Sequence, residues 1–381
     1  MSTVPHLDLA RQHAALRDEI LAAWAEVLDS GAFVGGPHVA AFEEELAAAC
    51  GTSRALGVAS GTDALKLALR VLELSPGDEV VVPAFTFVAT AGAVLEAGAT
   101  PVPCDVGESD ALLDVASLKQ ALSPRTKAVL PVHLYGMPCD PGPIDEALAD
   151  RDDVAVIYDA AQAIGAQLHG EPIGGLGRAS TYSFYPTKNL AALGDAGAIV
   201  TDDAAFADRL RVIADHGRPL DPKRRDQHDL PGHNSRLDGL QATVLRLKLQ
   251  RLEGWQERRD AIASRYLAVL DGQEVARPQA LTPGARSAWH QFALRHPERD
   301  VFAKQLLERG VQTRVIYPRC LTELAALSHL GWSTESTPAA LAWSREVLTL
   351  PVFPELTDDE VDRVVEALAT TLEGVSRAGA A

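Results

Sequence analysis

Short apolar and β-branched runs alternate with longer amphipathic stretches between residue 55 and about residue 202. This alternation restricts the fold more than any other feature, because strands separated by helix-length segments pair in parallel and leave the connecting helices on the faces of the sheet. We therefore predict an α/β fold built on a mostly parallel, seven-stranded sheet with flanking helices. The predicted strands are residues 55–58, 79–83, 100–102, 126–132, 155–159, 180–183 and 198–201.

Residues 238–271 carry apolar side chains at helical spacing over far more than the length of an average helix. We interpret this segment as one long helix that leads from a large domain, residues 1–250, into a smaller α+β domain, residues 251–381. Further helices are expected at 63–72, 87–97, 301–309 and 358–372, and short strands of the smaller domain at 291–294 and 312–315.

The charge balance excludes two classes of partner. The 52 Asp and Glu outnumber the 35 Lys and Arg, and the resulting formal charge of −17 would repel nucleic acid and anionic membrane surfaces. A ligand that carries phosphate therefore needs a local basic site or a helix end. No apolar run reaches the roughly 20 residues that span a bilayer. Residues 1–11 are mixed and polar rather than a secretory signal, so we expect a cytoplasmic protein.

The cysteines and histidines do not indicate a metal site. The four cysteines form no C-x-x-C pair, so neither a disulfide framework nor a zinc knuckle is predicted. His228 and His233 lie close in the sequence, but no third ligand at a suitable spacing accompanies them. We expect a protein without a metal.

Residues 60–63, Ser-Gly-Thr-Asp, follow a predicted strand and precede a predicted helix. Small residues there expose backbone N–H groups at the positive end of the helix, which suits a phosphate, although the same residues are also ordinary helix caps. No Walker P-loop occurs in the chain, and the glycines at 174, 175 and 177 do not complete a dinucleotide fingerprint because the third glycine position holds Ser180.

Three further side chains stand at predicted strand ends. Asp159 ends the hydrophobic run 155–159, Phe87 follows the second strand, and Lys188 lies in a loop flanked by glycines after strand 180–183. Ligands bind at the carboxyl ends of strands in open α/β sheets. A helix start for phosphate, an acid for a pyridine nitrogen, an aromatic side chain and an amine that can form an imine together indicate a pyridoxal phosphate site.

The chain resembles, over nearly its whole length, the DegT/DnrJ/EryC1/StrS family of pyridoxal-phosphate-dependent sugar aminotransferases, which have fold type I. The resemblance is carried by short segments in the same order along the chain. These segments are residues 5–9, 35–39 with Phe42 and Glu43, 60–65, 82–90, 131–136, 159–163, 183–189, 233–238 and 350–356.

The resemblance implies a role for each matching residue. Lys188 is expected to carry the cofactor as a Schiff base, and Asp159 to face its pyridine nitrogen. Lys188 also argues for transamination, because relatives with histidine there dehydrate sugars instead. The remaining contacts implied are Gln162 to the ring hydroxyl, Phe87 to the ring face, and Gly61, Thr62 and Ser183 to the phosphate. Asn234 is expected to reach the cofactor of a neighbouring subunit, so a homodimer with two shared sites is implied.

The resemblance also implies the reaction. L-Glutamate would donate its amino group to the cofactor, and a nucleotide-linked keto-sugar would take that group in the second half of a ping-pong cycle. Within the family, the segments at 5–9 and 133–136 favour a dTDP-3-keto-6-deoxyhexose as acceptor. The alternatives are a C4-keto-sugar, a keto-inositol that yields an aminocyclitol, and a non-catalytic regulatory protein that binds pyridoxal phosphate.

Two segments are candidates for the acceptor. Residues 218–234 form a Pro- and Gly-containing loop that is rich in basic residues, and we interpret Lys223, Arg224 and Arg225 as a clamp for the diphosphate; the alternative is a solvated surface loop. At residues 316–322 the chain reads Ile-Tyr-Pro-Arg-Cys-Leu-Thr, where many relatives read His-Tyr-Pro-x-Pro-Leu-His. Tyr317 remains a candidate sugar contact, and the loss of both histidines leaves the sugar open.

Overall fold

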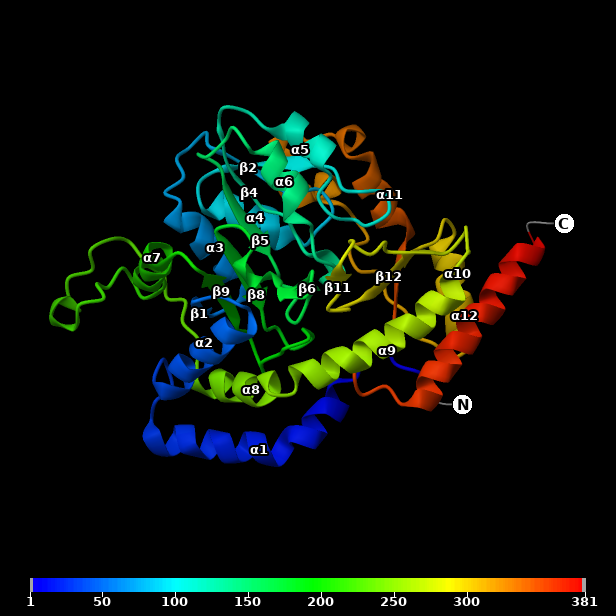
Figure 1. Cartoon of the computed structure of the whole chain (residues 1–381), viewed down its shortest axis with the longest axis horizontal. Helices are drawn as coiled ribbons and strands as arrows, with labels where there is room; N and C mark the ends of the chain where they lie inside the picture. The colour runs from blue at the N-terminus through cyan, green and yellow to red at the C-terminus, as the bar shows by residue number, and fades with distance from the viewer. Residues whose placement is uncertain (1–2, 379–381) are drawn as a thin grey trace.

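The computed structural model describes residues 3–378, and a seven-stranded sheet forms its centre (Figure 1). The strands lie in the order β1-β9-β8-β5-β4-β2-β3, and β9 alone runs antiparallel to its neighbours in this sheet. The predicted mostly parallel seven-stranded sheet is thereby confirmed. The bounds are β1 Arg54–Val58, β2 Glu79–Pro83, β3 Thr100–Cys104, β4 Thr126–Val129, β5 Ala155–Asp159, β8 Ala179–Ser183 and β9 Gly197–Thr201.

Alternate residues of the central strands face opposite layers of helices, as the two-residue period of a strand requires. Val81 of β2 and Val129 of β4 belong to the apolar cluster beneath α5, α6 and α11, whereas Val80 and Ala128 belong to the cluster beneath α3, α4 and α7. Both faces are covered, which explains why these strands are apolar throughout. The helices are α3 Gly61–Val71, α4 Val88–Glu96, α5 Val115–Ala121, α6 Pro141–Ala147, α7 Ala204–Ala214 and α11 Pro338–Glu346.

The single long helix predicted at 238–271 is wrong, because two helices occupy this segment: α8, Gly239–Leu249, and α9, Leu252–Leu270. At the junction the amide of Arg251 bonds the carbonyl of Lys248 instead of continuing the helical ladder. The Arg251 guanidinium donates to the carbonyl of Leu247 and also binds Glu19. These bonds satisfy carbonyls that the break exposes.

The N-terminal helices α1, Leu9–Ser30, and α2, Pro37–Ala49, pack against α8, and α1 follows α8 along the lower edge of Figure 1. Beyond the break, α9 packs against α12, Asp358–Ala378, and α10 is Arg299–Glu308. These helices enclose an apolar cluster with the three-stranded sheet β10-β12-β13, whose strands are Arg277–Pro278, Phe292–Arg295 and Val347–Leu350. The division into two domains at residues 250 and 251 stays a prediction, and it falls between α8 and α9.

The strand predicted at 312–315 is wrong, because this segment pairs with a neighbour only through an isolated bridge between Arg314 and Thr349. A second small sheet was not predicted; its two-residue strands are β6 Gln167–Leu168, β7 Glu171–Pro172 and β11 Ala285–Arg286. The 3-10 helices are η1 Leu134–Gly136, η2 Ile173–Gly175, η3 Pro222–Arg224, η4 Leu321–Glu323, η5 Ala325–Leu330 and η6 Thr334–Ser336.

Within residues 3–378, no helix combines the length and the apolar character that a membrane crossing demands.

Candidate active site

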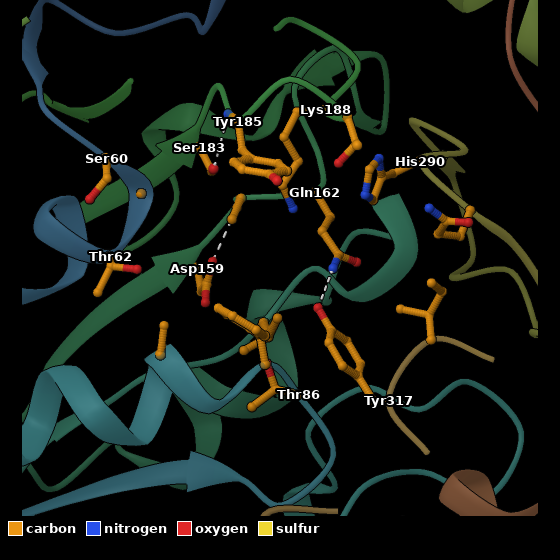
Figure 2. A pocket seen from close by; sticks show the side chains of 18 of the residues that line it. Ser60, Thr62, Thr86, Asp159, Gln162, Ser183, Tyr185, Lys188, His290 and Tyr317 are labelled. Atoms are coloured by element: carbon orange, nitrogen blue, oxygen red, sulfur yellow. Dashed lines mark hydrogen bonds between the residues drawn. The ribbon is translucent and has the colours of Figure 1, made fainter. Parts of the chain in front are cut away.

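A cavity of about 360 Å³ lies where strands β1, β2, β5 and β8 end at their carboxyl sides. Most of the residues predicted from the sequence line it, and Figure 2 shows Ser60, Thr62 and Ser183 on one side and His290 and Tyr317 on the other. The predicted residues that line the cavity are Gly61, Thr62, Phe87, Asp159, Gln162, Ser183, Lys188 and Tyr317.

The start of α3 provides an anion site at one end of the cavity. Ser60 caps this helix, because its hydroxyl accepts from the amide of Asp63 at 3.1 Å and its carbonyl accepts from the amide of Ala64. The amides of Gly61 and Thr62 precede the first helical hydrogen bond, so they face outward at the positive end of the helix dipole. A Cβ on Gly61 would lie 2.5 Å from the Cβ of Ser183. Glycine therefore allows the helix start and the Ser183 hydroxyl to share one site.

Asp159 is a buried carboxylate at the end of β5, and its residue is only 5% exposed. Burial raises the pKa of this carboxyl above its ordinary value, and bonds from the Ala161 amide and the Thr90 hydroxyl together with the charge of Lys188 offset part of that rise. The amide donates to Oδ1 at 3.1 Å and the hydroxyl donates to Oδ2 at 3.0 Å. Each oxygen thus accepts one bond, which favours the ionised form and fixes the plane of the carboxylate.

Lys188 lies partly buried in the loop after β8, and its amide donates to the carbonyl of Tyr185 at 2.8 Å. Burial lowers the pKa of its ammonium from 10.5 to about 8, and the carboxylate of Asp159 opposes this shift. At pH 7 about a tenth of the amine is therefore neutral and nucleophilic, far more than of an ordinary lysine. This is the property that imine chemistry requires of a lysine.

Gln162 joins two walls of the cavity. Its Oε1 accepts from the amide of Tyr135 at 2.6 Å, and its Nε2 donates to the hydroxyl of Tyr317 at 2.8 Å. Both tyrosines have a positive φ, 60° at Tyr135 and 68° at Tyr317, a conformation that is costly for bulky residues. The Phe87 ring, 52% exposed, lies 6.1 Å from the Tyr317 ring between centroids. The Phe87 and Tyr317 rings thus lie on the same side of the cavity, and the Tyr317 ring stands on a backbone of positive φ.

His290 lines the cavity and was missed by the sequence analysis. Asn189 Nδ2 donates to the carbonyl of Ala288 at 2.6 Å, so Asn189 Oδ1 faces His290 Nδ1 at 3.1 Å and must accept its proton. Burial, together with the charge of Lys188, holds the pKa of His290 well below its usual value, so the ring is neutral. Nε2 is then left as a hydrogen-bond acceptor.

Other residues of the site were also missed, and their sequence signals were weak; one of them, Thr90, does not line the cavity but binds Asp159. Thr90 follows a predicted strand as one of several threonines in residues 82–90, and only its bond to Asp159 distinguishes it. His6 and Arg314 reach the cavity from segments far from the central strands. No local spacing could have associated them with Lys188.

Four predicted residues do not line this cavity. Asn234 accepts a hydrogen bond from Arg236 at 2.7 Å beside the bridge to Asp215. Lys223, Arg224 and Arg225 are exposed around η3, in the loop that extends away from the sheet after α7 (Figure 1). Within its own chain this basic loop is remote from the sheet ends.

The residues present fit pyridoxal phosphate. The α3 start and Ser183 suit its phosphate, Asp159 suits its pyridine nitrogen, and Lys188 suits its aldehyde. The missing side chain of Gly61 leaves the space that a phosphate on the α3 amides needs.

Residues 14–369 match the sequence profile of the DegT/DnrJ/EryC1/StrS aminotransferase family. The chain is 42% identical over 375 residues to the dTDP-3-amino-3,4,6-trideoxy-alpha-D-glucose transaminase of Streptomyces venezuelae, covering 98% of both chains. It is 41% identical over 374 residues to the UDP-N-acetyl-3-dehydro-alpha-D-glucosamine 3-aminotransferase of Acidithiobacillus ferrooxidans, covering 98% of this chain and 99% of the other.

The fold is also similar to those of solved structures. The crystal structure of S. venezuelae DesV superposes with a TM-score of 0.93 at 42% identity, covering 98% of this chain and 99% of the other. NtdA of Bacillus subtilis, crystallised with the bound cofactor PMP, superposes with a TM-score of 0.88 at 32% identity, covering 98% of this chain and 86% of the other. Both likenesses extend over nearly the whole fold.

We predict that Gly61→Ala weakens cofactor binding at least tenfold. The added Cβ must displace either the α3 start or Ser183, and overpacking of this kind costs about 1–3 kcal/mol. Fluorescence titration of cofactor-free protein with pyridoxal phosphate measures the effect. The matched control is Gly92→Ala in α4, where an added Cβ meets no atom within 4 Å. Equal affinities in the two variants would contradict the shared site at Gly61 and Ser183.

Thr90→Val should raise the pKa of Asp159 by about one unit, because a hydrogen bond to a charged group is worth about 1.5–3 kcal/mol. The protonated carboxyl then persists to higher pH. The acid limb of the reaction with an amino donor should move upward by about one pH unit, whereas Thr90→Ser, which retains the hydroxyl, should leave it in place. If the acid limb of the valine variant stays where it is in the unaltered protein, the Thr90 hydroxyl does not lower the pKa of Asp159.

In cofactor-free protein, acetylation of Lys188 by acetic anhydride should rise tenfold per pH unit and level off near pH 8, following its lowered pKa. Peptide mass spectrometry measures the rate, with N-acetyl-lysine in the same tube as reference. Because Asp159 raises the pKa of Lys188, Asp159→Asn should move the plateau to lower pH. A plateau that stays in place or moves upward would show that the two groups are not coupled as described.

Proposed function

Because the chain belongs to the DegT/DnrJ/EryC1/StrS aminotransferase family, we propose that it uses pyridoxal phosphate to move an amino group from L-glutamate to a nucleotide-linked keto-sugar. The observation that carries the proposal is that Lys188 and Asp159 line one cavity together with the first residues of α3, where backbone amides can bind a phosphate. The two half-reactions form a ping-pong cycle, since donor and acceptor use the same cavity in turn.

Bound in this cavity, the cofactor supplies an electron-withdrawing ring that weakens the bond between the donor α-carbon and its hydrogen. Asp159 holds a proton on the ring nitrogen through its ionised carboxylate, which Thr90 and Ala161 keep charged. Lys188 Nζ would take the proton from the donor α-carbon and deliver it to the carbon of the cofactor that was the aldehyde, a role that suits an amine whose pKa is about 8.

Other residues of the chain bind and orient. The amides of Gly61 and Thr62 and the Ser183 hydroxyl hold the phosphate, and the Phe87 ring restrains one face of the cofactor. Gln162 has one N–H occupied by Tyr317, so its second N–H is free for the ring hydroxyl. Tyr317 thereby comes next to both cofactor and sugar, which supports its role as an acceptor contact.

The acceptor that we favour is a dTDP-3-keto-6-deoxyhexose. Its support is the likeness to the S. venezuelae dTDP-sugar transaminase over 98% of the chain. A relative of nearly equal identity is named for a UDP-linked 3-keto sugar, so amination at C3 has broader support than the choice of nucleotide. The C4-keto-sugar and keto-inositol alternatives make up the rest of the test panel.

The active unit that we propose is a homodimer with two shared sites. Its support is that Asn234 and the basic loop at Lys223, Arg224 and Arg225 stand away from the cavity of their own chain. A second subunit would bring Asn234 to the cofactor phosphate and the three cations to the diphosphate of the acceptor, where a local positive charge is needed in a chain of formal charge −17.

The decisive experiment incubates purified holoenzyme with L-glutamate and a panel of dTDP- and UDP-linked 3-keto and 4-keto sugars and a keto-inositol. Mass spectrometry should detect an aminated 3-keto-6-deoxyhexose and 2-oxoglutarate in equal amounts. Conversion of keto-inositol alone would replace the nucleotide-sugar assignment. Absence of any spectral change with glutamate or other amino donors would instead favour a non-catalytic protein that binds the cofactor.

Lys188→Ala should fold, bind pyridoxal phosphate without a covalent bond, and lose at least a thousandfold in turnover, because it lacks the group that holds the cofactor and moves the proton. Borohydride reduction followed by peptide mapping should attach the cofactor to Lys188 in the unaltered protein and to no peptide in the variant. Normal turnover in the variant, or a label on another peptide, would refute the role of Lys188.

A further inference from the structure

Arg314 brings a cation without a counter-charge into the wall of the cavity. It lines the cavity together with His6, Gln291, Ile316 and Tyr317. Among the side chains of residues 3–373, no carboxylate pairs with its guanidinium within 4.0 Å, whereas most other arginines of this part of the chain have such a partner. An arginine fork that lacks a partner is a ready site for a planar anion.

The backbone of Arg314 is held by hydrogen bonds to Thr349, which places the start of this exposed side chain at the cavity wall. Its amide donates to the Thr349 carbonyl at 3.2 Å, and its carbonyl accepts from the Thr349 amide at 2.8 Å and from the Thr349 hydroxyl at 3.0 Å. Because that hydroxyl has only one proton to donate, His6 Nε2, at 2.8 Å from it, must be the donor in their contact.

The neighbours of Arg314 do not neutralise its charge. His6 is buried, and burial together with the charge of Arg314 lowers its pKa to about 4, so the ring is neutral. The two carboxylates that line the cavity, Asp159 and Asp195, form no ion pair with Arg314 within 4.0 Å. The charge of Arg314 is therefore available to whatever enters the cavity.

We propose that Arg314 binds a carboxylate of the amino donor during the first half of the cycle, an assignment that rests on the proposed function. A dicarboxylic amino acid carries one carboxylate on the reacting carbon and a second one a few bonds away, so an anion enters the cavity with it. Near its reacting carbon, a nucleotide-linked keto-sugar has a neutral ring with hydroxyl groups.

The size of the cavity supports the donor over the diphosphate of the acceptor. About 360 Å³ suits an amino acid beside a cofactor, whereas a nucleotide must extend outside. The exposed basic loop around η3 is available for the diphosphate there. Arg314 therefore binds the donor, and its replacement should weaken the half-reaction with the amino donor more than the half-reaction with the keto-sugar.

The test compares holoenzyme variants Arg314→Gln and Arg314→Lys with Arg319→Gln. Arg319 is a matched control, because it is also exposed, lies in the same segment and does not line the cavity. In single-turnover reactions, the half-saturating concentration of L-glutamate should rise tenfold or more in Arg314→Gln, less in Arg314→Lys and less than twofold in Arg319→Gln. The KM of the keto-sugar should change less than threefold in all three variants.

A binding measurement without turnover separates this proposal from the proposed function. Calorimetric titration of the holoenzyme with glutarate, a dicarboxylate that has no amino group, should give a Kd that rises tenfold or more in Arg314→Gln alone. Failure of wild-type protein to bind glutarate, or equal binding by the variant, overturns the proposal whatever the acceptor is. A normal glutarate result without glutamate turnover would contradict the proposed function and leave the carboxylate site supported.

Comparison of L-glutamate with L-2-aminobutyrate, which lacks the distal carboxylate, then identifies the group bound. If Arg314 binds the α-carboxylate, the half-saturating concentrations of both donors should rise by the same factor in Arg314→Gln. If Arg314 binds the distal carboxylate, only the half-saturating concentration of L-glutamate should rise, and that of L-2-aminobutyrate should stay the same. A rise in the KM of the nucleotide-sugar with donor saturation unchanged would assign Arg314 to the diphosphate and overturn the proposal.

Discussion

The site depends on keeping one buried carboxylate charged. Asp159 is almost fully buried at the end of β5, where burial alone would favour its neutral form. Two donors from different parts of the chain prevent this: the Ala161 amide of the next turn and the Thr90 hydroxyl of α4. Helix α4 must therefore lie against the end of β5, which requires the β5-β4-β2 order of the sheet. The charge so preserved also limits how far burial lowers the pKa of Lys188.

A second glycine, in addition to Gly61, allows the anion site to form beside that carboxylate. Gly197 of β9 pairs with Val58 of β1 on one side and with Ser183 of β8 on the other. A Cβ there would lie 2.4 Å from the backbone of Ser60, so any side chain would push the α3 start away from Ser183. The antiparallel strand β9 between β1 and β8 is thus not a defect in a parallel sheet. It sets the separation between the helix start and the serine.

The sequence predicts the parts of the site that lie at strand ends, because an apolar run followed by a polar residue marks a strand end locally. Asp159 and Lys188 are of this kind. His290, His6 and Arg314 could not be found in this way, since tertiary packing brings them from the N-terminal segment and from the region after α9. The break between α8 and α9 could not be predicted for a related reason, because apolar residues at helical spacing continue across it. The bonds of Arg251 to Leu247 and Glu19 that stabilise the break form only in the folded chain.

One wall of the cavity is formed by the ends of strands of the central sheet, and the other by an irregular segment. The residues that would hold the cofactor lie in the first wall, and the candidate substrate contacts lie in the second. Asp159 and Ser183 terminate strands whose ladders fix them, so a change at either disturbs the central sheet. Arg314 and Tyr317 lie in an irregular segment that is joined to β13 by one bridge. Arg314, Ile316 and Tyr317 of this segment line the cavity, whereas Cys320 and Leu321 are buried in the core. Substitutions at Arg314 and Ile316 can therefore change the groups offered to donor and acceptor while the strand ends that hold the cofactor stay in place.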